Sequence, residues 1–211
     1  MVQLQDIKKS YGSHVVVEVP SFTLEQNIYW LKGINGSGKT TLMKLIAGLL
    51  PFEGDVIIDH DVTIKKKRAE FLRLVNYAEA EPLYPPFLSG NDLLQLYIKS
   101  KNGTQDQAKE LIAALQVGSF IENPTGTYSS GMLKKISLLL AFIGQPKLIL
   151  LDEPLVTIDD KTVPAINRII RDYHEQNGVT FLLTSHQLFE SNAFPITHQL
   201  EMKDDNIKTL P

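Results

Sequence analysis

The sequence predicts an α/β protein with a mostly parallel sheet, an N-terminal antiparallel β subdomain and an inserted helical subdomain. Strand-like and helix-like segments alternate at both ends of the chain, with a helical block near residues 84–140 between them. Two short apolar runs, in KLILLDEP and VTFLLTSH, are typical of buried parallel strands. The first thirty residues contain several strand-like segments in succession. We therefore expect a single domain over residues 1–211, with the helical subdomain at about 84–140 inserted into its α/β core.

Composition and charge narrow the functional classes. The chain has 211 residues, of which 43% are hydrophobic, which suits one compact core. A net charge of −3 gives no basic surface for nucleic acid, and KKKR at 65–68 is either a solvated loop or a contact for lipid or a partner. The longest apolar run, ISLLLAFIG, is well short of the ~20 residues of a membrane span. We expect a chain that is soluble by itself. This expectation does not decide whether the chain works at a membrane.

The N-terminal elements can be assigned in order. VQLQDI, HVVVEV, SFTL and IYWLKG have strand patterns, and the last runs into a glycine-rich loop. A helix is expected from about Lys39 to Leu50, closed by Pro51. GDVIIDHDVTI then has the pattern of a short hairpin.

Helices dominate the middle of the chain. They are expected over 90–116, where the second one opens with Thr104 and Gln107 in capping-box spacing. A long apolar helix is expected from Met132 to Ile143, directly after two serines and a glycine.

The C-terminal third returns to alternation of strands and helices. After KLILLDEP, either Asp159 or Asp160 can cap a helix that ends at Asn177-Gly178. VTFLLTSH is the second buried strand, and ITHQLEMKDDNIKTL has the pattern of a closing hairpin.

The glycine-rich loop is the strongest chemical signal. GINGSGKTT matches G-x-x-x-x-G-K-[ST] in full, and it follows a predicted strand and opens a predicted helix, as a phosphate-binding P-loop requires. Backbone N–H groups of such a loop surround phosphate oxygens, Lys39 neutralises the outer phosphates, and the Thr40 hydroxyl can ligate Mg²⁺. The predicted ATP-binding residues of this loop are Gly33, Asn35, Gly36, Ser37, Gly38, Lys39, Thr40 and Thr41.

Two carboxylates follow the first buried strand. Asp152 at the end of LILL is placed to be the second ligand of the Mg²⁺. Glu153, the next residue, can take the proton of an attacking water. A plain strand terminus is the alternative interpretation of the pair.

His186 ends the second buried strand, in TSHQ, and the carboxyl ends of such strands are where α/β sheets bind ligands. We interpret His186 as a catalytic contact to the γ-phosphate, with a structural histidine as the alternative.

A second anion site is predicted in TYSSGMLKK. Ser129, Ser130 and Gly131 precede the apolar helix, and hydroxyls and backbone N–H groups at a helix start suit an anion. One chain thus has two phosphate cradles about ninety residues apart.

These motifs, in this order, resemble the nucleotide-binding subunit of ABC transporters over essentially the whole chain. The resemblance implies a P-loop ATPase fold, ATP and Mg²⁺ as ligands, and further roles: Tyr11 would stack on adenine, and Asp159 in TIDD would be the D-loop aspartate. YSSGM stands where the family has its signature loop, which clamps the γ-phosphate of ATP bound to a second subunit. Ser130 replaces the first glycine of that loop, and Met132 replaces its glutamine.

One position departs from the family. A glutamine thought to touch Mg²⁺ and water follows the strand before the helical subdomain, but this chain has NYAEAEPLYPP, with Ala80 at that place and no glutamine in 69–94. Either Glu79 or Glu81 substitutes for it, or the chain hydrolyses ATP poorly. Glu79 and Glu81 are expected to point together, opposite to Ala80.

The expected function is ATP hydrolysis that powers a separate transmembrane permease, in the manner of exporters with separate subunits. The chain would pair with a second ATP-binding subunit, identical or a close paralogue, and would lie in the cytoplasm on the inner face of the cell membrane. An asymmetric pair with weak hydrolysis, and a soluble ABC ATPase outside transport, are the alternatives. EPLYPPFL together with Phe71 is expected to form an apolar groove for a permease helix.

Overall fold

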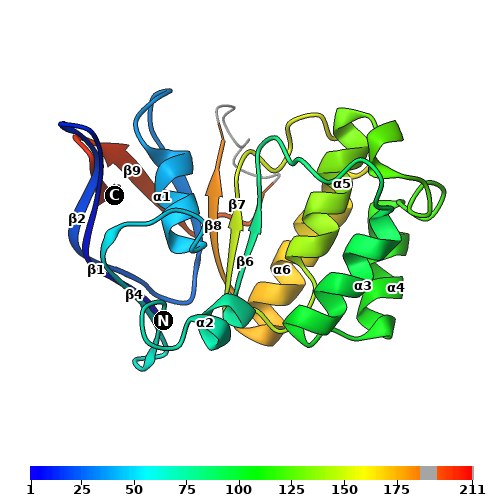
Figure 1. Ribbon diagram of the computed structural model, residues 1–211, viewed down its shortest axis with the longest axis horizontal. Helices are drawn as coiled ribbons and strands as arrows, with labels where there is room; N and C mark the ends of the chain where they lie inside the picture. The colour runs from blue at the N-terminus through cyan, green and yellow to red at the C-terminus, as the bar shows by residue number, and fades with distance from the viewer. Residues whose placement is uncertain (186–193, 211) are drawn as a thin grey trace.

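The computed structural model describes residues 1–185 and 194–210, which form two sheets and a group of helices (Figure 1). The N-terminal sheet is antiparallel, in the order β2-β1-β4-β5. Its strands are β1 (Val2–Tyr11), β2 (His14–Leu24), β4 (Glu53–Ile58) and β5 (Val62–Thr63).

The second sheet is mostly parallel, in the order β10-β9-β3-β8-β7-β6. All neighbouring strands in it run parallel except β9 and β10, which form the predicted closing hairpin. The predicted fold class is therefore confirmed. The strands are β3 (Ile28–Lys32), β6 (Val75–Ala78), β7 (Leu148–Leu151), β8 (Thr180–Thr184), β9 (His198–Lys203) and β10 (Asn206–Thr209).

This sheet separates two hydrophobic cores, and β7 shows how. Leu148 and Leu150 face the core shared with the antiparallel sheet, whereas Ile149 and Leu151 face the core shared with the helices. Successive strand residues point to opposite faces, so a strand with a core on each side must be apolar throughout. The first core also contains helix α1 (Lys39–Ile46), which is placed directly after the glycine-rich loop.

Most of the remaining helices cover the other face of the sheet and extend away from it (Figure 1). Helix α6 (Val163–Asn177) packs on the sheet through Ile166, Ile169 and Ile170. Helices α3 (Gly90–Lys101), α4 (Gln105–Leu115) and α5 (Ser130–Ala141) lie together, with the short α2 (Arg68–Leu74) and η1 (Thr125–Thr127) at their margins. No helix among the described residues is long and apolar enough to cross a membrane.

Several boundaries differ from the sequence prediction. HVVVEV and SFTL form one strand, β2, because Pro20 lies on an edge strand, where a missing N–H is tolerated. Helix α1 ends at Ile46 rather than Leu50, since Gly48 turns the chain with φ +73°. The N-cap residue of α6 is Thr162, whose N–H and hydroxyl both donate to Asp159 Oδ1.

The predicted capping box is only half formed. Thr104 caps α4 by accepting from the N–H of Gln107. The Gln107 amide does not return to Thr104, because it donates instead to the carbonyl oxygens of Phe142 and Gly144. A complete capping box exists at Ser89 and Asp92, before α3.

Candidate active site

The loop between β3 and α1 depends on glycine because the backbone packs tightly there. A Cβ atom on Gly33 would lie 2.6 Å from Ser37 Oγ and 2.9 Å from the Met202 carbonyl oxygen. On Gly38, at φ +97°, it would lie 2.7 Å from the Val16 carbonyl oxygen. Gly38 is also the N-cap of α1 and offers no side-chain cap, so the N–H groups of the first helical turn are available to a ligand.

Lys39 lies over this loop and is almost fully buried. Its Nζ donates to the carbonyl oxygens of Gly33, at 2.7 Å, and Ile34, at 2.9 Å. Burial lowers the pKa of Lys39, while the nearby carboxylates of Glu153 and Asp152 act in the opposite direction. The ammonium is thus held beside the exposed helix start by acceptors that a phosphate could replace.

An open cleft of about 250 Å³ lies over the loop and the start of α1. Seven of the eight predicted loop residues line it; Gly33 does not. Val16, on β2, lines the cleft although nothing in the sequence singled it out. Its complete lining is Val16, Asn35, Gly36, Ser37, Gly38, Lys39, Thr40, Thr41, Ala80, Asp152 and Glu153.

Tyr11 stands at the end of β1 and does not line the cleft. Its side chain is 53% exposed, and Lys9 Nζ lies 4.9 Å from the centre of its ring. The ring therefore has a face in solvent, near a cation.

Asp152 is buried at the end of β7, and neighbouring strands fix both of its carboxylate oxygens. Thr184 Oγ1, at the end of β8, donates to Oδ1 at 2.5 Å, and the Tyr77 hydroxyl, on β6, donates to Oδ2 at 3.2 Å. Burial raises the pKa of Tyr77, and the charge of Asp152 adds to this effect. Each oxygen keeps a further acceptor position, so Asp152 is a rigid carboxylate facing the cleft that Thr40 also lines.

Glu153 follows Asp152 and is 7% exposed. Its backbone has φ +48°, a conformation that is uncommon for a residue with a side chain and often marks a functional position. Its N–H donates to the same hydroxyl, Thr184 Oγ1, at 3.1 Å. The turn that puts Asp152 and Glu153 on one cleft wall is therefore held by β8.

The loop after β6 brings Ala80 to the cleft wall, where its methyl side chain offers no polar group. Glu79 points away and pairs with Lys44 on α1, at 3.4 Å. Glu81 is exposed and does not line the cleft. Neither glutamate takes the place of a glutamine side chain in this structure.

The start of α5 lies on the surface. Ser129 is its N-cap, and its Oγ accepts from the N–H of Met132 at 3.2 Å; Ser130 is also exposed. Gly131 must be glycine, because a Cβ atom there would lie 2.6 Å from the Thr157 carbonyl oxygen. Asp159, in the same turn as Thr157, pairs with Lys135 on α5 at 2.6 Å, which lowers the pKa of Asp159 to about 2.

One buried lysine was not anticipated by the sequence. Lys134, on α5, is completely buried, and its Nζ donates to three carbonyl oxygens: those of Glu79, Ala80 and Asp152. Burial lowers its pKa to about 8.

Two remaining sequence predictions meet different outcomes. His186 lies outside the described residues. Phe71 is fully buried in the first core, so its predicted place in the groove is wrong. Leu83 and Phe87 are 89% and 77% exposed.

A groove of about 510 Å³ does exist nearby, between the end of α1, α2 and α3. Leu49, Leu72, Leu96 and Tyr97 give it an apolar lining, and Leu49 and Leu96 are more than half exposed. Arg73 and Glu79 are among its polar residues.

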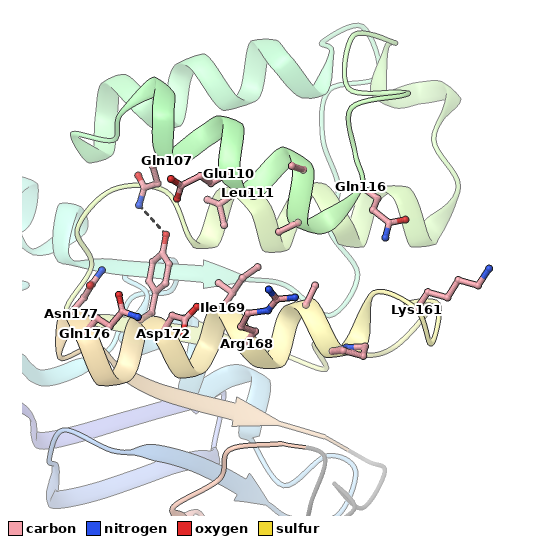
Figure 2. Close-up of a pocket in the computed structure, with 15 residues that line it drawn as sticks. Gln107, Glu110, Leu111, Gln116, Lys161, Arg168, Ile169, Asp172, Gln176 and Asn177 are labelled. Atoms are coloured by element: carbon pink, nitrogen blue, oxygen red, sulfur yellow. Dashed lines mark hydrogen bonds between the residues drawn. The ribbon is translucent and has the colours of Figure 1, made fainter.

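A larger hollow, of about 770 Å³, lies elsewhere, between α4 and α6 (Figure 2). It contains none of the predicted site residues. At one end the Gln107 amide donates to the Tyr173 hydroxyl at 2.9 Å (Figure 2).

Comparison with known proteins covers most of the chain. The sequence profile of the ABC transporter family matches residues 18–156. The chain is 33% identical over 189 residues to the cytochrome c biogenesis ATP-binding export protein CcmA of Legionella pneumophila, covering 89% of this chain and 93% of that protein. It is 30% identical over 197 residues to the tungstate uptake ATP-binding protein TupC of Peptoclostridium acidaminophilum, covering 89% and 87%.

A longer relative is the linearmycin resistance ATP-binding protein LnrL of Bacillus subtilis, 29% identical over 195 residues; the match covers 90% of this chain but 62% of LnrL. Among solved structures, an ATP-binding subunit of an ABC transporter has a TM-score of 0.88 at 20% identity, covering 100% of this chain and 90% of that one. A dimeric ATP-binding cassette in a post-hydrolysis state, bound to ADP and Pi, has a TM-score of 0.82 at 21% identity, covering 100% and 99%. These two likenesses concern the fold.

Proposed function

Because the chain belongs to the ABC transporter family and is an ATP-binding ATPase subunit of it, we propose that it hydrolyses Mg-ATP in the described cleft to drive a separate membrane permease. The observation that carries this proposal is the meeting of two distant segments. Residues 35–41 and the Asp152-Glu153 pair, more than a hundred positions apart, line one cleft.

The loop and Lys39 bind the triphosphate. Exchange of the Gly33 and Ile34 carbonyl oxygens for phosphate oxygens would give the ammonium charged partners, which form stronger hydrogen bonds. Tyr11, with an exposed ring face, stacks on the adenine beyond the cleft, and Val16 contacts the nucleoside from β2.

The residues present fit a magnesium ion. Thr40 and Asp152 line the same cleft and offer a hydroxyl and a carboxylate oxygen, the hard donors that Mg²⁺ prefers when water and phosphate complete its shell. Bound there with ATP, the ion neutralises charge on the outer phosphates. Thr184 and Tyr77 hold the Asp152 carboxylate in its orientation.

Glu153 acts as the general base for the attacking water. Its buried carboxylate reaches the cleft from the turn at φ +48°, next to the metal carboxylate. His186 is proposed as a further contact to the γ-phosphate, from the segment that follows β8.

A second ATP-binding subunit completes the site. Ser129, Ser130 and Gly131 stand on the surface at the start of α5 and would hold the γ-phosphate of ATP bound by the other subunit. Asp159, tied to α5 through Lys135, would lie at the same interface. The dimeric form of a cassette with the same fold supports this arrangement.

The permease is proposed to dock in the groove between α1, α2 and α3. Exposed leucines in a groove of about 510 Å³ suit the apolar face of a helix, and Glu79 connects the groove to Ala80 on the cleft wall. A chain bound in this way lies at the inner face of the cell membrane. Nucleic acid is not a proposed partner, since the net charge is −3.

Export is the proposed direction. CcmA, 33% identical and matched over 93% of its length, is an export protein, and SrtF of Streptococcus pyogenes, 27% identical, is named for lantibiotic transport. TupC, at 30%, serves tungstate uptake, so relatives of both directions exist. Transport into inverted membrane vesicles driven by external ATP distinguishes the two directions.

A second candidate function is one half of an asymmetric pair, in which this chain binds ATP and hydrolyses it weakly. The observation in its favour is Ala80, which gives the cleft wall a methyl group where the family has glutamine, while Glu79 is engaged by Lys44.

Steady-state hydrolysis by the purified chain tests the proposal. We expect Mg²⁺-dependent phosphate release that Glu153→Gln abolishes. Binding of ATP without release above that of Glu153→Gln would favour the asymmetric pair.

Membrane fractionation tests the docking groove. We expect Leu96→Glu to move the chain from the membrane fraction to the soluble fraction. The control Lys109→Glu, on the exposed surface of α4, should leave the chain in the membrane fraction. An unchanged distribution for Leu96→Glu would place the docking site elsewhere.

A further inference from the structure

Lys134 lies in the second turn of α5, five residues after Ser129, and none of its side chain is exposed. A charged side chain is seldom fully buried unless every charged donor has a partner, because the loss of hydration is costly. The burial of Lys134 therefore calls for a specific role for its ammonium group.

The contacts of Lys134 use the whole ammonium. Its Nζ lies 2.6 Å from the Glu79 carbonyl oxygen, 2.7 Å from that of Asp152 and 3.3 Å from that of Ala80. An ammonium has three N–H donors and no acceptor, so three carbonyl oxygens match it completely. An apolar side chain at this position would leave three carbonyl oxygens without this donor.

The three acceptors belong to the wall of the ATP cleft. The carbonyl of Asp152 is part of the peptide group that leads to Glu153, and Glu153 holds the unusual φ of +48°. The carbonyls of Glu79 and Ala80 belong to the loop after β6, where Ala80 lines the cleft without a polar side chain. The ammonium thus fixes the backbone on both sides of the place where water would attack.

The next residue, Lys135, differs in its surroundings. It pairs with Asp159, whose side chain is 50% exposed, and ion pairs near water contribute little to stability. Lys134 is the member of the LKK sequence that connects α5 to the cleft.

We propose that Lys134 is a positioning residue for hydrolysis, which couples the start of α5 to the Asp152–Glu153 peptide group and to the Glu79–Ala80 loop. This inference rests on the proposed function. When a second subunit's phosphate binds at Ser129 and Ser130, a movement of α5 reaches Glu153 through the ammonium. Ala80 has no polar side chain that could link this loop to the cleft. The hydrogen bond from Lys134 to the Ala80 carbonyl oxygen makes a link through the backbone instead.

Lys134→Met tests the proposal, because methionine keeps an unbranched chain as far as the Cε position and lacks the ammonium donors. We expect the turnover number to fall roughly 10- to 100-fold, as small misplacements of catalytic groups do, and the dissociation constant for ATP to stay within about threefold. Both are measured on the purified full chain with Mg²⁺, by phosphate release and by equilibrium binding.

Gln107→Met is the matched control. The Gln107 amide also binds backbone carbonyl oxygens, those of Phe142 and Gly144, but beyond the other end of α5. We expect this variant to lose thermal stability much as Lys134→Met does and to keep its turnover number within about twofold.

Several results would overturn the proposal. Turnover that falls no further in Lys134→Met than in Gln107→Met would leave Lys134 with a structural role only, and an equal loss of ATP affinity would make it a binding residue. If Lys134→Met does not fold, Lys134→Gln, which still has an N–H donor but no charge, must show the same separation between turnover and affinity. If the unchanged chain does not hydrolyse ATP, the proposed function itself fails; if it does and Lys134→Met equals it, only this inference fails.

Discussion

Two helix starts in this chain are the proposed phosphate sites, and they differ in how much of the site each one contains. Helix α1 begins at Gly38, which has a left-handed backbone and no capping side chain, so the N–H groups of its first turn remain available. Helix α5 begins at Ser129, whose hydroxyl already accepts from the N–H of Met132. The first is an open cradle, and the second is a capped helix start with an exposed surface.

The charged side chains around the two helix starts differ more than the helix starts themselves do. Lys39, Asp152 and Glu153 surround the start of α1. At α5, Lys134 turns inward to three carbonyl oxygens, and Lys135 is engaged by Asp159. The start of α1 therefore has a cation and two carboxylates beside it within one chain, whereas the start of α5 has serine hydroxyls and N–H groups. This contrast agrees with the role that the family resemblance implies for the start of α5, which is to contact a phosphate that another subunit binds.

The largest expected effect concerns chemistry at α1. Glu153→Gln should lower the turnover number by about 10²–10⁴-fold, because a general base acts only in the chemical step. ATP affinity should be retained, and the variant should accumulate as a dimer with Mg-ATP. Phosphate release, equilibrium binding and light-scattering mass measure the three quantities. An equal loss of affinity would contradict the role of Glu153 as a base.

The next effect concerns binding at α1. Lys39→Ala should weaken ATP binding by roughly 100-fold, since a lost hydrogen bond to a charged group costs ~1.5–3 kcal/mol and every 1.4 kcal/mol is tenfold. Equilibrium titration with a fluorescent ATP analogue measures it. An affinity for ATP within about twofold of that of the unchanged chain would show that Lys39 does not contact the phosphates.

At α5, Ser129→Ala should cost ~1 kcal/mol of stability through the lost N-cap and leave ATP affinity unchanged. In the Glu153→Gln background it should also reduce the ATP-dependent dimer. Ser89→Ala is the matched control, because Ser89 caps α3 in the same way, away from the proposed phosphate sites. Equal dimer formation by both variants would remove the phosphate role of Ser129.

The last effect concerns the loop after β6, which contains Ala80. Ala80→Gln should raise turnover by up to about tenfold, the equivalent of one added hydrogen bond in the transition state. Glu79→Ala should leave turnover unchanged, because Glu79 pairs with Lys44 outside the cleft. A loss of turnover in Glu79→Ala would show that this glutamate reaches the site during hydrolysis.

The parts of the site that are contiguous in sequence could be predicted. The glycine-rich loop and the Asp152-Glu153 pair each depend on local geometry, a tight turn before a helix and an apolar strand end, and both lie on the cleft. The unbroken apolar run of β7 likewise predicted that this strand is buried on both faces.

The residues contributed by distant elements could not be predicted. Val16 reaches the cleft from a neighbouring sheet, and Thr184 and Tyr77 reach Asp152 from the two strands beside β7; no spacing in the sequence reveals these contacts. The prediction that Phe71 lines a groove failed for a related reason, since an aromatic residue on a short helix fits a core as well as a groove. Lys134 was missed because a lysine in a helix usually points to solvent.

Complementation between two damaged chains tests most directly whether the two cradles form one site across two subunits. Lys39→Ala damages the cradle at α1. Ser129→Asp keeps an N-cap residue at α5 but places a negative charge where the other subunit's phosphate would lie. A dimer with one chain of each kind contains one site with an intact Lys39 and an intact Ser129, and one site with neither.

Each variant alone should hydrolyse ATP at less than about a tenth of the normal rate, since each loses a contact to a charged group. We predict that mixing the two restores a substantial part of the activity of the unchanged chain, with a maximum near equal amounts. Activity in the mixture that equals the sum of the separate variants at every ratio would contradict the account, because each chain would then use only its own cradles.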